Sequence, residues 1–289
     1  MNRTLSGQLA QAGLVCAFVM LLLAIILVAG RATPLAQGFG AVSIVIVFAH
    51  AVAALGWFEA LSFTAICLTV TFAVENLGVR TGFPFGHYAF LVEPGLPHIG
   101  AIPLIVGPLY FGMGYPSWVI ANLLFGQGVK RPSTWARLFA VPIIAAFVMV
   151  QWDVVMDPSG STLAHAWIWY DGGGYFGVPL SNFLGWLLVT YLYFQGFSFF
   201  LYMRRMKPAH PIRSRTFWLV PILLYLAAGL CYISPLFDAN ERLVDAAGRV
   251  WWATNLRETT VIVMLVTMLP TSLLALLRLG RAVMPAPPA

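Results

Sequence analysis

Long apolar runs alternate with short polar segments along the chain. Eight apolar runs, each near the roughly 20 residues that span a bilayer as a helix, lie at 12–30, 38–57, 60–78, 101–125, 137–156, 179–202, 216–234 and 258–278. Only a turn near Leu55 and Gly56 separates the second and third runs. They are therefore either two helices or one long bent helix followed by a re-entrant piece. The pattern predicts an all-α polytopic membrane protein of about eight transmembrane helices, forming a single domain over residues 1–289.

Composition supports this class. Hydrophobic residues make up 60% of the chain and charged residues 9%, whereas a soluble domain carries about 25% charged residues. The three cysteines lie in apolar runs without CxxC spacing, so we interpret them as buried hydrophobic residues and not as a disulfide or zinc framework. The net charge of +6 comes from basic residues in a few loops, which is typical of membrane orientation and does not predict a nucleic-acid partner.

The loop charges predict which ends of the spans face the cytoplasm. Most lysines and arginines lie near the two termini and in loops 126–137 and 203–215, whereas nearly all acids lie in or beside loops 79–100, 157–178 and 235–257. The positive-inside rule then places both termini in the cytoplasm, in what we expect to be a bacterial inner membrane. The three acidic loops should converge on the opposite face, as short irregular or re-entrant segments.

Three polar segments adjoin apolar runs. They are ENLGVRTGFPFGHYAF at Glu75–Phe90, QWDVVMDP at Gln151–Pro158 and WIWYDGGGYFGVPLSNFLGW at Trp167–Trp186. Polar groups cost free energy in a bilayer, so those that persist there have a partner or a function. These segments are therefore the first place to look for a site.

Four polar side chains in these segments are expected at similar depth. Asp153 and Asp157 are spaced to share one helix face, and the helix is expected to end at Asp157 because Pro158 follows it. Glu75 lies near the end of its own span, and Asn182 lies just inside the next one. A common depth at one membrane face favours a shared site.

A purely structural role for these groups remains open. Glu75 would then pair with Arg80, and Asp153 would hydrogen-bond Asn182 to hold helices together. Glu59 is expected about 24 Å from Glu75 along one helix, at the opposite end. The acids in loop 235–257 are expected to be solvated; they are Asp238, Glu241 and Asp245.

Aromatic residues surround the acids and favour a functional site, although part of them would also serve as interfacial anchors. We expect a substrate-binding wall formed by Trp152, Trp167, Trp169, Tyr175 and Trp186. The Gly82–Gly86 segment is expected to fold inward with Gly86 at positive φ. Phe83, Phe85 and Tyr88 would then complete the wall.

The histidine spacing does not favour a metal centre. None of the five histidines forms an HxxxH or HxxH pair, whereas a membrane di-iron centre needs clustered histidines. His87, in the PFGHY turn, is the histidine expected nearest the site. We therefore predict neither a metal nor a cofactor.

Together, the three polar segments resemble the membrane-integral carotenoid 1,2-hydratases, a family often labelled only carotenoid biosynthesis protein. The motifs cover roughly residues 74–186, and the rest of the chain agrees in hydropathy. The resemblance implies hydration of the terminal 1,2 double bond of an acyclic carotenoid, without a cofactor. Its implied partners are the carotenoid or another isoprenoid, membrane lipid and other enzymes of carotenoid synthesis.

By analogy with the family, Asp153 is the leading general acid and Glu75 orients water, or the two roles are exchanged. Asp157 and Asn182 would position them. Protonation of the alkene would give a tertiary cation that aromatic faces stabilise, and burial helps a carboxyl group to keep its proton.

Two other classes of function stay open. A proton-coupled transporter or lipid-binding membrane protein would use the acids as a relay, although we find no internal repeat. An isoprenoid cyclase or isomerase would use the same acid but discharge the cation by losing a proton. Gradient-free turnover separates the first class from an enzyme, and product mass separates hydration from the second.

Overall fold

Helices form most of the protein. The computed structural model describes residues 2–31, 33–91, 95–126, 132–204 and 215–282. The helices are α1 Asn2–Val28, α2 Pro34–Leu55, α3 Trp57–Thr81, α4 Val106–Leu124, α5 Trp135–Pro158, α6 Leu180–Met203, α7 Arg215–Leu230, α8 Ala253–Val266 and α9 Met268–Ala282. A π-helical turn, η1 Ser159–Leu163, follows α5, and a 3-10 helix, η2 Cys231–Phe237, follows α7. Each predicted apolar run thus contains a helix.

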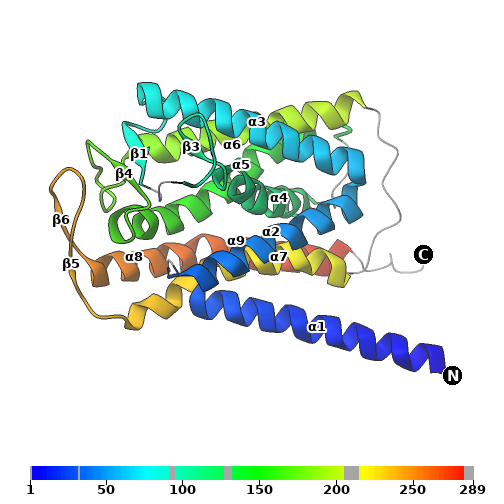
Figure 1. Cartoon of the computed structure of the whole chain (residues 1–289). Coiled ribbons are helices and arrows are strands. Elements are labelled where there is room, and N and C mark those ends of the chain that lie inside the picture. The colour runs from blue at the N-terminus through cyan, green and yellow to red at the C-terminus, as the bar shows by residue number, and fades with distance from the viewer. Residues whose placement is uncertain (1, 32, 92–94, 127–131, 205–214, 283–289) are drawn as a thin grey trace.

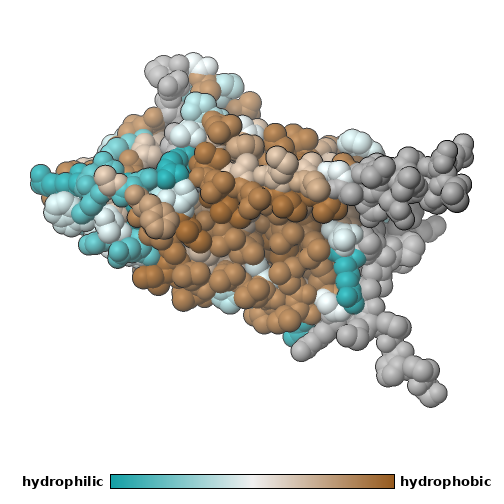
Figure 2. Space-filling model, turned by 90° about the horizontal axis from the view of Figure 1, so that it is seen from below, coloured by the Kyte–Doolittle hydropathy of each residue, from teal (hydrophilic) through white to brown (hydrophobic). Residues whose placement is uncertain are grey.

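Six helical segments of the described chain are long and apolar enough to cross a membrane. They are 34–55, 57–81, 135–163, 180–203, 215–237 and 253–280, and a shorter apolar helix lies at 13–28. Figure 2 shows the matching surface, a broad apolar belt with hydrophilic residues toward either end. The prediction of a mainly helical membrane protein is confirmed, and the number of spans remains a prediction.

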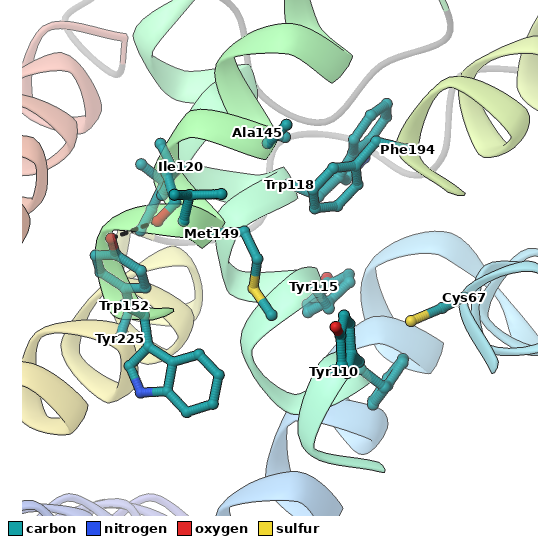
Figure 3. Packing of buried hydrophobic residues seen from close by; sticks show 14 of the residues in the cluster. Cys67, Tyr110, Tyr115, Trp118, Ile120, Ala145, Met149, Trp152, Phe194 and Tyr225 are labelled. Carbon is teal, nitrogen blue, oxygen red and sulfur yellow. Dashed lines mark hydrogen bonds between the residues drawn. The ribbon is translucent and has the colours of Figure 1, made fainter. Parts of the chain in front are cut away.

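Helix α4 lies at the centre of the bundle. It packs against α2, α3, α5, α7 and α9, and most of its side chains are buried. The ring planes of Trp118 in α4 and Phe194 in α6 are inclined by 21°, with centroids 5.8 Å apart (Figure 3). Close packing of this kind, with interhelical hydrogen bonds, holds helices together in a membrane, where lipid is as apolar as the side chains.

One helix boundary decides between two predicted alternatives, and another differs from its prediction. Gly56, at φ +96°, ends α2 and precedes α3, so the second and third runs are two helices. The helix predicted to end at Asp157 instead includes Pro158 and continues into η1. That prediction was wrong.

Side chains replace the backbone hydrogen bonds that internal prolines remove. A proline has no N–H for the carbonyl four residues earlier. For Pro158 that carbonyl belongs to Val154, and the Tyr175 hydroxyl donates to it at 3.2 Å. The Tyr175 hydroxyl thus replaces the backbone hydrogen bond that Pro158 cannot make, which explains how the helix continues through Pro158.

The same arrangement recurs at two other prolines. The Leu138 carbonyl, freed by Pro142, accepts from Gln195 Nε2 at 3.2 Å and Ser198 Oγ at 3.0 Å. The Phe217 carbonyl, freed by Pro221, lies 2.9 Å from His50 Nε2. These hydrogen bonds between helices account for three polar residues in apolar helices without invoking a site: Gln195, Ser198 and His50.

Three short antiparallel strand pairs lie at one end of the bundle (Figure 1). They pair β1 Tyr88–Phe90 with β4 Trp167–Trp169, β2 His98–Ile99 with β3 Ile102–Pro103, and β5 Arg242–Val244 with β6 Val250–Trp252. Arg249 Nη1 also donates to the Gly173 carbonyl at 2.9 Å, which joins the third acidic loop to the second. The described parts of the three acidic loops thus lie at one end of the bundle, and their common membrane face remains a prediction.

The opposite end of the bundle carries the start of α1 and the end of α9 (Figure 1). Most of the two predicted cytoplasmic loops, at residues 127–131 and 205–214, lies outside the described residues. Which end faces the cytoplasm remains a prediction.

Candidate active site

A cavity lies beneath the β1–β4 strand pair, between α3, α4, α5 and α6. It has a free volume of about 70 Å³, more than one water molecule requires. Its wall is almost entirely aromatic and aliphatic, with few polar groups. The residues that line it are Glu75, Phe85, Tyr88, Phe90, Val106, Leu109, Tyr110, Trp152, Met156, Asp157, Trp167, Trp169, Asn182 and Trp186.

Glu75 enters the cavity from the last third of α3. The Tyr110 hydroxyl in α4 donates to its Oε1 at 2.6 Å, and the Tyr88 hydroxyl in β1 donates to its Oε2. Burial and the neighbouring carboxyl raise the pKa of Tyr88 well above its ordinary value, so this hydroxyl keeps its proton and remains a donor. Both oxygens of Glu75 thus accept from tyrosines, which favours a carboxylate held in one orientation.

Asp153 and Asp157 share one face of α5 and one partner in α6. Asn182 Nδ2 donates to Asp157 Oδ2 and, at 3.2 Å, to Asp153 Oδ2. The two carboxyl groups therefore meet at one amide nitrogen. Carboxylates have no donor, so a direct hydrogen bond between the two aspartates would require a shared proton.

The two aspartates differ in what they face. Asp157 lines the cavity and lies within reach of the Trp167 side chain. Asp153 is completely buried behind it and is absent from the cavity wall. Its Oδ1 has no hydrogen-bond donor among the described residues.

Strand pairing positions the roof of the cavity. Tyr88 pairs with Trp169 and Phe90 with Trp167, so residues from two distant loops face the acids together. Trp169 Nε1 and Ser181 Oγ both donate to the Phe85 carbonyl, at 3.1 and 3.2 Å. These bonds hold the turn before β1 against α6.

Small residues allow Phe85 to enter the bundle. A Cβ atom on Gly78 would come within 2.8 Å of the Phe85 ring, and one on Gly185 would come within 2.6 Å. Gly86 has φ +94°, as predicted, which L-residues rarely adopt. The inward fold of the turn is therefore confirmed for Phe85 and Tyr88.

Stacked aromatic rings form one side of the cavity. Tyr110 and Trp186 are nearly parallel, at 7° with centroids 4.3 Å apart. Trp152 meets Trp186 edge-on at 6.0 Å. Figure 3 shows Tyr110 and Trp152 on separate helices beside the buried core. Such faces are electron-rich and attract a cation.

The structure brings most predicted site residues together but leaves three outside the wall, Asp153, Phe83 and Tyr175. Phe83 is 61% exposed, so its expected place in the cavity is not confirmed. Tyr175 instead supports α5 through the Val154 carbonyl, and burial raises its pKa to about 12. His87 pairs with Asp171 at the exposed surface, 2.9 Å apart, away from the cavity wall.

Tyr110 is the main site residue that the sequence reasoning missed. It lies in an apolar helix, where a buried tyrosine hydroxyl needs a partner. That requirement was the available signal, and the partner is Glu75. The alternative pairing of Glu75 with Arg80 is not among the ion pairs of the described residues.

The remaining acids have structural partners. Glu59 meets Arg204 at 3.3 Å at the opposite end of α3, as its predicted separation from Glu75 requires. A hydrogen bond from Arg31 holds the pKa of Asp238 below its ordinary value. Asp245 was expected to be solvated but is buried, with Oδ2 accepting from Trp251 Nε1 at 2.9 Å. That expectation was wrong because the side chain closes its own hairpin.

No group of three histidine, cysteine or acidic side chains suited to a metal ion occurs within the described ranges.

Comparison with known proteins identifies the family. The family model described as carotenoid biosynthesis protein matches residues 38–237, which include every residue of the cavity wall. A bisanhydrobacterioruberin hydratase from Haloarcula japonica is 32% identical over 124 residues, which are 43% of this chain and 40% of that protein. The match thus spans less than half of the relative. No solved structure matches the chain. The chain belongs to the carotenoid biosynthesis protein family.

Proposed function

We propose that the protein adds water to the terminal 1,2 double bond of an acyclic carotenoid end group, giving a tertiary alcohol, without a cofactor. The observation that carries this proposal is the cavity itself, where two carboxyl groups, Glu75 and Asp157, enter an otherwise apolar aromatic wall. The family and the hydratase relative support the same kind of substrate and reaction. Bisanhydrobacterioruberin belongs to the name of the relative, and the acyclic carotenoid end group is our proposal for this chain.

The reaction needs one proton and one water molecule. A carboxylic acid gives its proton to C2, and the electron pair of the double bond forms the new C–H bond. The tertiary cation left at C1 accepts an electron pair from water, and the resulting oxonium loses a proton. That proton restores the acid, so alkene and water become alcohol without net consumption of a proton.

Asp157 is the proton donor in this proposal. It faces the cavity, whereas Asp153, the donor expected from the sequence, lies behind it. Asp153 keeps a role as the second carboxyl of the pair, from which Asp157 is reprotonated. Asn182 holds both carboxyls in place through its amide nitrogen.

Glu75 orients the attacking water. Its two tyrosine partners fix both oxygens, and a fixed carboxylate accepts a hydrogen bond from water in a defined direction. The faces of Trp186 and Tyr110 and the other indoles of the wall stabilise the cation. The polyene remains in the apolar belt of the molecule while its end group enters the cavity.

A gradient-free reaction tests the proposal. Purified protein in lipid nanodiscs, with an acyclic carotenoid and oxygen-labelled water, should give a product that contains one labelled oxygen. Nanodiscs support no ion gradient, so a proton-coupled transporter would leave the carotenoid unchanged. An isomer or cyclised product of unchanged mass would show that the cation loses a proton, and would overturn hydration.

A further inference from the structure

A second, polar cavity lies beside the first, under the β5–β6 hairpin. Its free volume is about 10 Å³, close to the space for one water molecule. It is bounded by η1, by the loops on both sides of β4 and by the turn between β5 and β6. Polar side chains that face it include Ser161, Thr162, His165 and Asp245. A cavity of this size needs two to four polar partners to hold water, and this one has them.

The cavity leads inward from an exposed mouth. His165 and Ala246 are exposed, whereas Ser161, Thr162 and Asp245 are 4%, 2% and 8% exposed. Its floor is therefore a pair of buried hydroxyl groups below a solvent-facing rim.

Unusual backbone builds this cavity. The π-helical turn η1 carries Ser161 and Thr162 directly after α5, and single π turns often mark functional sites. His165 and Phe176 are non-glycine residues at φ +50°. The Thr162 hydroxyl donates to the Phe176 carbonyl and ties these two segments together. Backbone held in sparsely populated regions costs free energy, and a site is one reason to retain it.

The polar cavity adjoins the reaction cavity. Trp169 lines both of them. Ser161 follows Asp157 by about one helical turn, roughly 6 Å along the axis. Ser161 thus lies about one helical turn from Asp157, and Trp169 is a side chain that the two cavities share.

We propose that this polar cavity is the entry site for the water molecule consumed by the reaction, held by the Ser161 and Thr162 hydroxyls. The inference rests on the proposed function. The nearly apolar wall of the reaction cavity offers bulk water few hydrogen-bond partners, whereas the separate polar entrance admits water one molecule at a time. The oxygen of that water forms the bond to C1, and one of its protons returns to the carboxyl pair.

Blocking the entrance should separate water supply from proton supply. Ala246→Phe fills the mouth, and Ser161→Ala removes a floor hydroxyl without adding bulk. Each should lower hydration by at least about tenfold, equivalent to roughly 1.4 kcal/mol. In variant protein equilibrated with deuterium oxide before the carotenoid is added, the first protonation should still place deuterium in the unhydrated carotenoid, because the donor Asp157 remains. Ala239→Phe, at an exposed position on the same end of the molecule outside both cavities, is the matched control.

Hydration at the wild-type rate in both blocked variants would overturn the entry site. A structure that shows ordered water gives a test independent of activity, because water should lie within hydrogen-bond distance of Ser161 Oγ. A dry cavity would overturn the inference whatever the activity. Water at Ser161 in a wild-type protein that hydrates no carotenoid would instead overturn the proposed function and retain the water site.

Discussion

The carboxyl groups of the cavity differ in their partners, and the difference suggests separate roles. Glu75 accepts from two tyrosines, whereas Asp157 shares Asn182 with a second carboxyl group. A carboxylate surrounded by donors is suited to orient water. A carboxyl pair that shares a proton is suited to deliver one.

Asp157→Asn should therefore reduce hydration by about 10²–10⁴-fold, the usual contribution of positioned proton transfer. The amide keeps the size of the side chain and a hydrogen-bonding group, so the protein should still accumulate in membranes. Glu59→Gln is the control, since Glu59 lies at the other end of the bundle beside Arg204. Product formation per amount of membrane protein is the measurement. Wild-type rates in Asp157→Asn, combined with an inactive Asp153→Asn, would return the donor role to Asp153.

At the scale of elements, the sequence predicted the helices better than the segments between them. Hydropathy alone locates spans because backbone in lipid must satisfy its own hydrogen bonds. It cannot show that β1 pairs with β4, since that register depends on residues nearly eighty positions apart. Hydropathy also cannot show whether a polar side chain in an apolar helix belongs to a site or only holds the helices together. Gln195 and His50 serve carbonyls freed by prolines, and only the fold reveals this.

The turn before β1 gives a prediction for a single element. Gly86→Val should strain the backbone at φ +94° and bring Cβ to 3.1 Å from Ser181 Oγ. Strain of this kind costs on the order of 1–3 kcal/mol. The variant should therefore unfold at lower temperature in detergent and lose activity. Gly174→Val is the control, because a Cβ there meets nothing within 4 Å and its φ is not positive. Equal melting temperatures for the two variants would show that the turn tolerates a side chain.

The whole molecule has one end with the strand pairs, where the cavity also lies, and another with the start of α1 and the end of α9 (Figure 1). We propose that the end with the strand pairs faces away from the cytoplasm and that about eight helices span the membrane, with the lipid contacting the apolar belt (Figure 2). The arginine and lysine distribution supports this orientation.

Cysteine labelling of intact cells tests the orientation. An impermeant thiol reagent should label Ala239→Cys at the end with the strand pairs and should not reach Ser133→Cys at the other end. Both positions are exposed. Cys67 and Cys231 are buried, as expected from the sequence. Cys16 is exposed, contrary to that expectation, and should first be replaced with alanine. Labelling of Ser133→Cys alone would reverse the proposed topology.

The most direct test of the central claim is the mass of the carotenoids that accumulate in a host producing an acyclic carotenoid. Cells that express the wild-type chain should contain a carotenoid heavier by one water molecule. Cells with equal membrane amounts of the Glu75→Gln, Asp157→Asn double variant should contain only the unmodified carotenoid. Absence of the heavier product with the wild type, or its full accumulation with the double variant, would contradict acid-catalysed hydration in this cavity.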